Sequence, residues 1–283
     1  MRRWEFIAGL AGVAAWPLVA CAQQAGVVAA TLASAPLELG GDWGGSPQHA
    51  AMRVIARMRE VCLAGLSLVS DRQPERLRVD NRGAGPPSVW LHADPPGVAW
   101  VFVAIGARDW SKLAYQFGHE LGHVLCNSWW ADAKPRPPCQ WLEEALVEAF
   151  SIRGLGLLAQ SWERDPPFAG DAAFGHAIRD YRQNVIHKYR SGGSKVGPWF
   201  RDNRLVLEHT NGVGVVEGPA IMAVVGALEA DSACVADLGA LNRWPGRTGV
   251  PLEEYLDLWV VSCRELGAPR RLPTWLRGTL GLG

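Results

Sequence analysis

The segment His119-Glu120-Leu121-Gly122-His123 constrains the fold of this chain more than any other feature. Residues four apart lie one above the other on an α-helix, so a helix would direct both imidazoles to the same side. The neighbouring residues keep the helical period, with apolar side chains at Leu113, Phe117, Leu121 and Leu125. We therefore expect a partly buried helix over residues 111–127 that carries both histidines on one face.

Gly122 is an unfavourable residue in the middle of this expected helix. A glycine there costs about 1 kcal/mol relative to alanine. The residue is understandable if another part of the chain must approach the helix closely, because glycine has no Cβ atom. We expect a close neighbour at this position.

The two histidines form a candidate metal site. His119 and His123 can bind one ion from the same helix face, and Glu120, one step round the helix, can reach a water molecule on that ion. A catalytic zinc normally has three protein ligands and one position open to water. The third ligand must come from elsewhere, and a second helix, expected over residues 141–160, begins with acidic residues at Glu143, Glu144 and Glu148.

The stretch Trp141-Leu142-Glu143-Glu144 resembles the gluzincins, which are metallopeptidases with His-Glu-x-x-His and a downstream glutamate. It is most similar to the Trp-Leu-x-Glu pattern of the M1 aminopeptidases. The resemblance covers residues 110–150 and implies that Glu144 is the third zinc ligand. By comparison with the thermolysin branch, it also implies that Glu148 supports a zinc histidine through the ring nitrogen that does not bind the metal.

Adjacent residues of a helix point about 100° apart, so Glu143 and Glu144 cannot both bind the same ion. With Glu144 as the ligand, we expect Glu143 to lie on another face of its helix. The tyrosine that donates to the transition state in M1 enzymes is absent from its expected place. Nothing in the sequence selects a replacement among Tyr181, Tyr189, His176, His187 and His209.

The resemblance implies a zinc-dependent metallopeptidase that acts on a peptide or protein substrate, with Glu120 as general base. Residues 97–105, just before the motif helix, read equally well as an edge strand along which zincins bind an extended substrate and as an internal strand. Two other functions stay open. The chain could bind zinc but be catalytically weak or hydrolyse another bond, or it could be a non-enzymatic exported binding protein.

The remaining pattern predicts an α+β chain, and the resemblance implies that residues 46–165 form a zincin-like catalytic region. A long helix over residues 46–69 precedes a small sheet that packs on the motif helix, with strands expected at 76–79, 88–92 and 98–105. Residues 166–283 form a mostly helical C-terminal half, with helices expected at 171–189, 219–228, 233–241 and 251–266. Residues 23–45 are rich in Ala and Gly and are expected to be a flexible tether.

Residues 1–22 have the features of a signal peptide. Two arginines precede an apolar run, and Ala20-Cys21-Ala22 provides a small-x-small cleavage pattern. Leu18-Val19-Ala20-Cys21 also resembles a lipobox, which makes Cys21 a candidate for lipidation. We expect an exported protein, either periplasmic or lipid-anchored to the membrane facing the periplasm.

Export permits disulfides among the remaining five cysteines, of which at least one must stay unpaired within the chain. Cys126 and Cys139 bracket a Pro-rich loop, and we expect them to form a disulfide. Lys and Arg together balance Asp and Glu at 28 each. This neutral charge gives no reason to expect nucleic acid as a partner, or a membrane other than through a lipid at Cys21.

Overall fold

The computed structural model describes residues 31–43, 45–66, 70–190, 195–209, 214 and 216–282. The predicted signal peptide and Cys21 lie outside these residues. The first half contains α1 (Thr31–Ser34), β1 (Leu37–Gly41), α2 (Gln48–Leu63), β2 (Arg76–Asn81), β3 (Ser88–Trp90), β4 (Val98–Val103), α3 (Trp110–Leu125) and α4 (Gln140–Arg164). The second half contains α5 (Phe174–Arg190), α6 (Val196–Leu207), α7 (Gly218–Ala230), α8 (Cys234–Leu238), the 3-10 helix η1 (Arg247–Gly249), α9 (Leu252–Leu266) and α10 (Arg271–Leu280).

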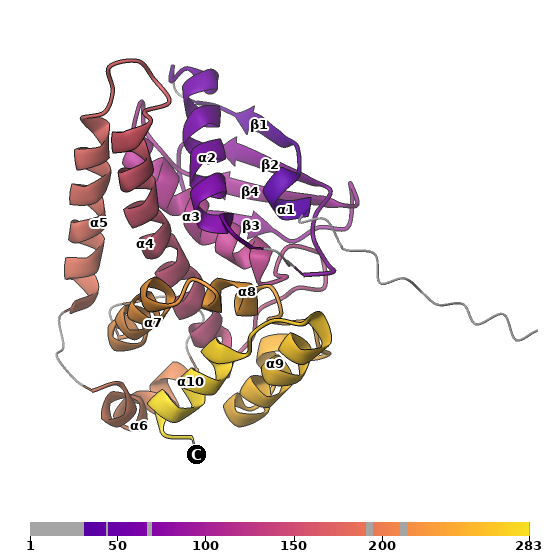
Figure 1. Ribbon diagram of the computed structural model, residues 1–283. Helices are drawn as coiled ribbons and strands as arrows, with labels where there is room; N and C mark the ends of the chain where they lie inside the picture. Colours follow the sequence, from indigo (N-terminus) through magenta and orange to yellow (C-terminus); the bar gives the residue numbers. More distant parts are fainter. Residues whose placement is uncertain are drawn as a thin grey trace, which may run out of the picture.

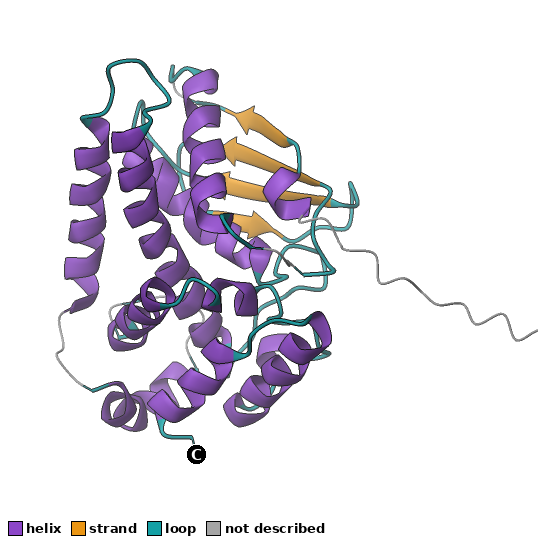
Figure 2. Cartoon of the chain, viewed as in Figure 1, coloured by secondary structure: helices purple, strands orange, loops and turns teal. Residues whose placement is uncertain are grey.

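The expectation of an α+β chain is confirmed. The four described strands form one mixed sheet in the order β1-β2-β4-β3. β1, β2 and β4 run parallel, whereas β3 pairs antiparallel with β4, with Val89 opposite Val101. Figures 1 and 2 show this sheet on one side of the molecule, with helices forming the rest.

The two possible roles of residues 97–105 are resolved by the strand order. β4 lies between β2 and β3, so it is an internal strand, and its side chains are almost all buried. The two edges of the described sheet are β1 and β3, and β3 hydrogen-bonds to β4 alone among its strands. Of the two interpretations, the edge strand is therefore the wrong one for this segment.

The prediction of a flexible tether over residues 23–45 is wrong for its second half. Leu37 to Gly41 form β1, which pairs with β2 from Leu77 to Asn81. Leu32 and Trp43 are buried in the core on either side of this strand. The Ala/Gly-rich composition misled the prediction because a short edge strand needs only a few apolar anchors.

One helical hairpin organises the structure around the predicted site. α3 contacts β3 and β4, and α4 returns antiparallel beside α3 while also contacting α2, α5 and α7.

The buried apolar side chains form a single cluster, whose members range along the chain from Leu32 to Leu280. The C-terminal half therefore shares the hydrophobic core of the first half. Two helices of the C-terminal half, α6 and α10, were not predicted from the sequence. No helix in the described part of the chain is long and apolar enough to cross a membrane.

The expected Cys126–Cys139 disulfide is not formed, since both residues are free, buried thiols. Within the α3–α4 pair, Gly118 lies against Ser151 and Gly122 against Val147. Continuing this antiparallel register places Cys126 beside Glu143, one turn further into α4 than Cys139. Cys139 instead directs its thiol to the carbonyl oxygen of Val250, 3.2 Å away.

Candidate metal site

The site is positioned by contacts that fix α3 against the sheet. The side-chain oxygen of Gln116 accepts a hydrogen bond from the backbone nitrogen of Ala104 at 2.8 Å, just beyond the end of β4. The Gln116 amide nitrogen donates back to the Ala104 carbonyl at 3.3 Å. This reciprocal pair, buried in the core, holds the helix that carries both histidines at a defined place beside the sheet.

The close neighbour expected at Gly122 is Val147 of α4. A Cβ atom added at Gly122 would lie 2.8 Å from the Cβ of Val147, which is closer than real side chains approach. At Gly118, one turn earlier, an added Cβ would meet Met58 and Ser151. The two glycines therefore allow α4 to pack tightly on α3, which brings the first turns of α4 beside the histidines.

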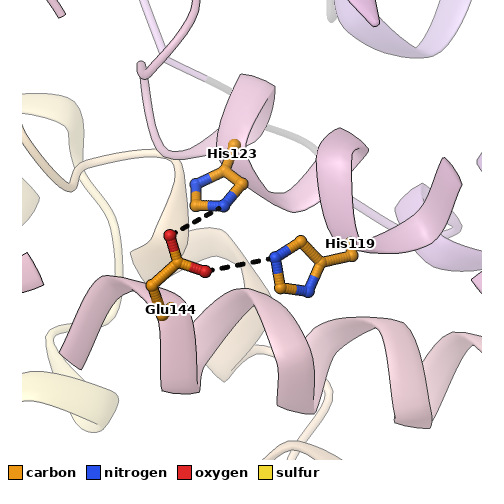
Figure 3. Close-up of side chains that lie close together, drawn as sticks. All are labelled: His119, His123 and Glu144. Carbon is orange, nitrogen blue, oxygen red and sulfur yellow. Dashed lines mark ion pairs between the residues drawn. The ribbon is translucent and has the colours of Figure 1, made fainter. Parts of the chain in front are cut away.

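His119, His123 and Glu144 lie together, as predicted from the sequence (Figure 3). The Glu144 carboxylate lies between the two rings. One oxygen is 3.3 Å from Nε2 of His119, and the other is 3.6 Å from Nε2 of His123. One nitrogen or oxygen atom from each of the three residues can be chosen so that all lie within 4.8 Å of one another.

These distances are close to the spacing of ligand atoms around a tetrahedral metal ion. Ligand atoms at a zinc-like bond length of about 2.05 Å, separated by the tetrahedral angle, lie about 3.3 Å from each other. Each Nε2 atom lies near this distance from one oxygen of Glu144, at 3.3 Å for His119 and 3.6 Å for His123, and the two contacts use different oxygens of the carboxylate. Two imidazole nitrogens and one carboxylate oxygen also form a donor set that suits zinc and similar divalent ions.

Glu148 lies behind His119, as the resemblance implies. Its carboxylate accepts a hydrogen bond from Nδ1 of His119 at 2.8 Å, which leaves Nε2 facing Glu144. The hydroxyl of Tyr115 donates to the other oxygen of Glu148, and the side chain of Tyr189 lies near the same carboxylate. Such a carboxylate fixes the ring and its tautomer, because the nitrogen facing the metal must be unprotonated.

Glu143 does not lie free on another face of α4, and that expectation is wrong. Its carboxylate accepts a hydrogen bond from Nδ1 of His123 at 2.9 Å and is only 1% exposed. The 100° separation of adjacent residues prevents both glutamates from binding one ion, but an imidazole has nitrogens on two sides. Glu144 faces Nε2 of His123 while Glu143 binds Nδ1 of the same ring.

A cleft of about 190 Å³ opens beside these residues. Its walls come from three places: the edge strand β3 with its flanks, the ends of α3 and α4 that carry the candidate ligands, and the loop between these helices. The lining residues are Pro87, Ser88, Val89, Leu91, His119, Glu120, His123, Ser128, Ala133, Pro135, Glu143 and Glu144. A backbone bridge between His92 and Trp130 holds the loop beside the continuation of β3.

Glu120 lines the cleft without belonging to the candidate ligand set. Its side chain is buried, and its carboxylate accepts no hydrogen bond from any described residue. Burial raises the pKa of Glu120, although the nearby charges of His119 and His123 oppose this shift. The carboxylate is therefore available to exchange a proton with a molecule in the cleft.

The two histidines hold protons strongly when no metal is bound. Burial alone would lower the pKa of His119, but hydrogen bonds to Glu144 and Glu148 raise it to about 10. Burial is likewise outweighed at His123, where the charge of Glu144 and a hydrogen bond to Glu143 raise the pKa well above its usual range. The same contacts hold the pKa of Glu144 below its usual range, despite the opposing effect of burial.

The described lining of the cleft contains no tyrosine and no histidine besides the two candidate ligands. Tyr189 is turned to Glu148, and the ring of Tyr181 packs 5.7 Å from that of Tyr115. The other residues considered from the sequence are also engaged elsewhere or lie at another surface: His176 pairs with Glu163, His209 with the Leu205 carbonyl, and His187 lines a separate surface pocket.

Three comparisons with known proteins add no relative. No family model, no curated protein and no solved structure matches the chain. The case for a function therefore rests on the residues of the site.

Proposed function

We propose that this protein is a zinc-dependent metallopeptidase of the gluzincin type. The observation that carries the proposal is that one ligand atom each from His119, His123 and Glu144 lie within 4.8 Å of one another, with a separate carboxylate holding the outer nitrogen of each histidine. A hydrogen-bonding partner on the outer nitrogen is the usual companion of a metal-binding histidine. Zinc is the metal that best suits this donor set.

A zincin-like fold is part of the proposal and is supported by three features. A small mixed sheet packs on the helix that carries the two histidines. The following helix brings the third candidate ligand to them. An antiparallel edge strand borders the same cleft.

In the proposed reaction, Glu120 moves the proton. When bound, the metal would polarise the scissile carbonyl and lower the pKa of a water molecule. Glu120 accepts the proton of that water and passes it to the leaving amine, for which a buried carboxylate with a raised pKa is suited. His119, His123 and Glu144 would hold the metal, while Glu143 and Glu148 keep the rings in place.

The substrate is proposed to be an extended peptide. In the described sheet, Ser88 to Trp90 pair with β4 on one side only, and Ser88 and Val89 line the cleft. An extended peptide can add to such an edge through backbone hydrogen bonds. Export to the periplasm, with or without a lipid at Cys21, stays a prediction from residues 1–22.

The decisive experiment compares the wild-type protein with His123→Ala and Glu120→Gln. Wild type is expected to carry about one zinc per chain and to cleave a mixed peptide library. His123→Ala should lose both properties, whereas Glu120→Gln should keep the metal and lose at least about 100-fold in turnover. Metal content by mass spectrometry and cleavage by liquid chromatography provide the two readouts.

Each result bears on a different part of the proposal. Wild-type protein with no metal, purified without chelator and then offered Zn²⁺, would contradict the metal site. Bound metal without any peptide cleavage would support the proposed metal site but contradict the proposed peptidase activity. Full turnover in Glu120→Gln would show that another group carries the proton.

A further inference from the structure

A buried carboxylate, Glu143, holds the outer nitrogen of His123 and is itself held by a polar network. One oxygen accepts hydrogen bonds from Nδ1 of His123 and from the hydroxyl of Ser128. The other accepts a hydrogen bond from the amide nitrogen of Asn242 at 2.8 Å, and a guanidinium nitrogen of Arg247 lies 3.7 Å away. An ionised carboxylate removed from water needs such partners to balance its desolvation.

The partners of Glu143 come from distant parts of the chain. Asn242 and Arg247 lie in the C-terminal half, about a hundred residues after Glu143, and both are buried. Arg247 also donates to the backbone oxygen of Asn127 at 2.7 Å and to the hydroxyl of Ser128. One guanidinium therefore connects the end of α3 to the carboxylate that holds His123.

The orientation of the Asn242 amide is fixed. Its oxygen accepts a hydrogen bond from the hydroxyl of Tyr255 at 3.0 Å, so its nitrogen must face Glu143. The same nitrogen lies 3.2 Å from the Cys126 carbonyl, which it can also reach as a donor. An amide held at both ends can position a neighbouring carboxylate without moving.

A second contact ties the same two segments together. The amide nitrogen of Asn127 donates to the carbonyls of Gly239 and Leu241 at 3.0 and 2.7 Å. Asn127 and Asn242 both adopt a positive φ, of 62° and 60°, a conformation that asparagine tolerates better than most residues. The two segments thus exchange hydrogen bonds in both directions directly behind His123.

We infer that Glu143 is a positioning residue for His123, and that Asn242 and Arg247 of the C-terminal half hold it in place. The inference rests on the metal site of the proposed function and adds that the site is incomplete without this network. Glu143 does not belong to the candidate ligand set, and its side chain is only 1% exposed. It acts by holding the ring of His123 so that Nε2 faces the metal position.

The test exchanges the two groups that face each other. Glu143→Gln leaves one acceptor oxygen where there were two, so its amide nitrogen must face either the amide nitrogen of Asn242 or Nδ1 of His123. Asn242→Asp places two carboxylates together. Glu143→Gln combined with Asn242→Asp restores one amide and one carboxylate in reversed positions. We expect each single variant to bind Zn²⁺ about 10- to 100-fold more weakly than wild type, with most of this loss recovered in the double variant.

The measurements are the Zn²⁺ dissociation constant by chelator competition and the visible absorption spectrum of the Co²⁺-loaded protein. The spectrum reports ligand geometry, which a loss of stability alone does not alter in molecules that remain folded. Arg247→Met should weaken Zn²⁺ binding in the same range. The matched control is Arg204→Met, which removes an arginine paired with Glu253 away from the site and should leave both readouts unchanged.

The outcomes separate the inference from the proposed function. Wild-type protein that binds neither ion would reject both. Wild-type binding with unchanged affinity and spectrum in Glu143→Gln and Arg247→Met would reject the inference alone. The inference would also be rejected if the double variant bound Zn²⁺ no more tightly than the single variant with the lower affinity. The loss of affinity would then not arise from the pairing of residues 143 and 242.

Discussion

At the scale of single residues, the site is defined by which nitrogen of each histidine faces which carboxylate. Both Nε2 atoms face Glu144, while Nδ1 of His119 contacts Glu148 and Nδ1 of His123 contacts Glu143. In the absence of metal, these carboxylates favour the protonated rings. Metal binding must therefore displace protons that the surroundings hold tightly.

This competition predicts an unusual pH dependence of metal affinity. The pKa of His119 is raised to about 10 in the metal-free protein, so its proton opposes metal binding at every pH below that value. Affinity should rise by about tenfold per pH unit for each proton displaced, and should keep rising above pH 7. An ordinary histidine with a pKa near 6.5 would stop contributing near pH 7.

The measurement is the apparent Zn²⁺ dissociation constant from pH 6 to pH 9, with chelators corrected for their own protonation. An affinity that levels off by pH 7 would contradict the predicted proton competition. Glu148→Gln gives a useful comparison, because it removes a charge that raises the pKa of His119 while leaving the three candidate ligands in place.

At the scale of elements, the pairing of α3 with α4 determines whether the candidate ligands meet. Gly122 and Val147 allow the two helices to approach, and this approach brings Glu144 to the histidines. The hydroxyl of Ser151 adds a hydrogen bond to the Tyr115 carbonyl at 2.7 Å, which fixes the register of the pair. The geometry of the site is thus a property of the helix pair.

Gly122→Ala should damage both stability and metal binding. Alanine favours a helix by about 1 kcal/mol over glycine, but its Cβ would overlap Val147, and overpacking of this kind costs about 1–3 kcal/mol. We expect a net loss of stability in urea denaturation and weaker Zn²⁺ binding, as α4 is pushed away from α3.

Gly226→Ala is the matched control for this substitution. Gly226 also lies within a helix, α7, but an added Cβ there would meet no atom within 4 Å. This variant should be as stable as wild type or up to about 1 kcal/mol more stable, with normal Zn²⁺ affinity. Equal stability of the two alanine variants would show that the contact between Gly122 and Val147 is not tight.

At the scale of the whole molecule, one core joins the sheet, the helix pair and the C-terminal helices. This core contains the five described cysteines as free thiols. Burial raises the pKa of Cys62 to about 12 and that of Cys234 to about 11, so few of these thiols ionise at neutral pH. The stability of the described fold therefore does not depend on a disulfide.

Native protein prepared without reductant should resist a water-soluble alkylating agent at Cys62, Cys126, Cys139, Cys234 and Cys263. After denaturation, still without reductant, all five should react. Peptide mapping by mass spectrometry checks each position. A peptide linked through Cys126 and Cys139 would show that the disulfide predicted from the sequence does form in the protein.

The local pattern of the sequence was sufficient to predict the helices α3 and α4, the three strands β2 to β4, and the placement of His119 and His123 on one helix face. The choice of Glu144 as their partner came from the resemblance to the gluzincin pattern. These features depend on the period of helices and strands and on the fixed spacing of two side chains on one turn. Tertiary structure alone decided that β3, and not β4, is an edge strand, that residues 37–41 join the sheet, and that Glu143 contacts His123. Asn242 and Arg247 reach Glu143 only because the C-terminal half folds back behind α3, and contacts between residues so far apart in the chain leave no local pattern.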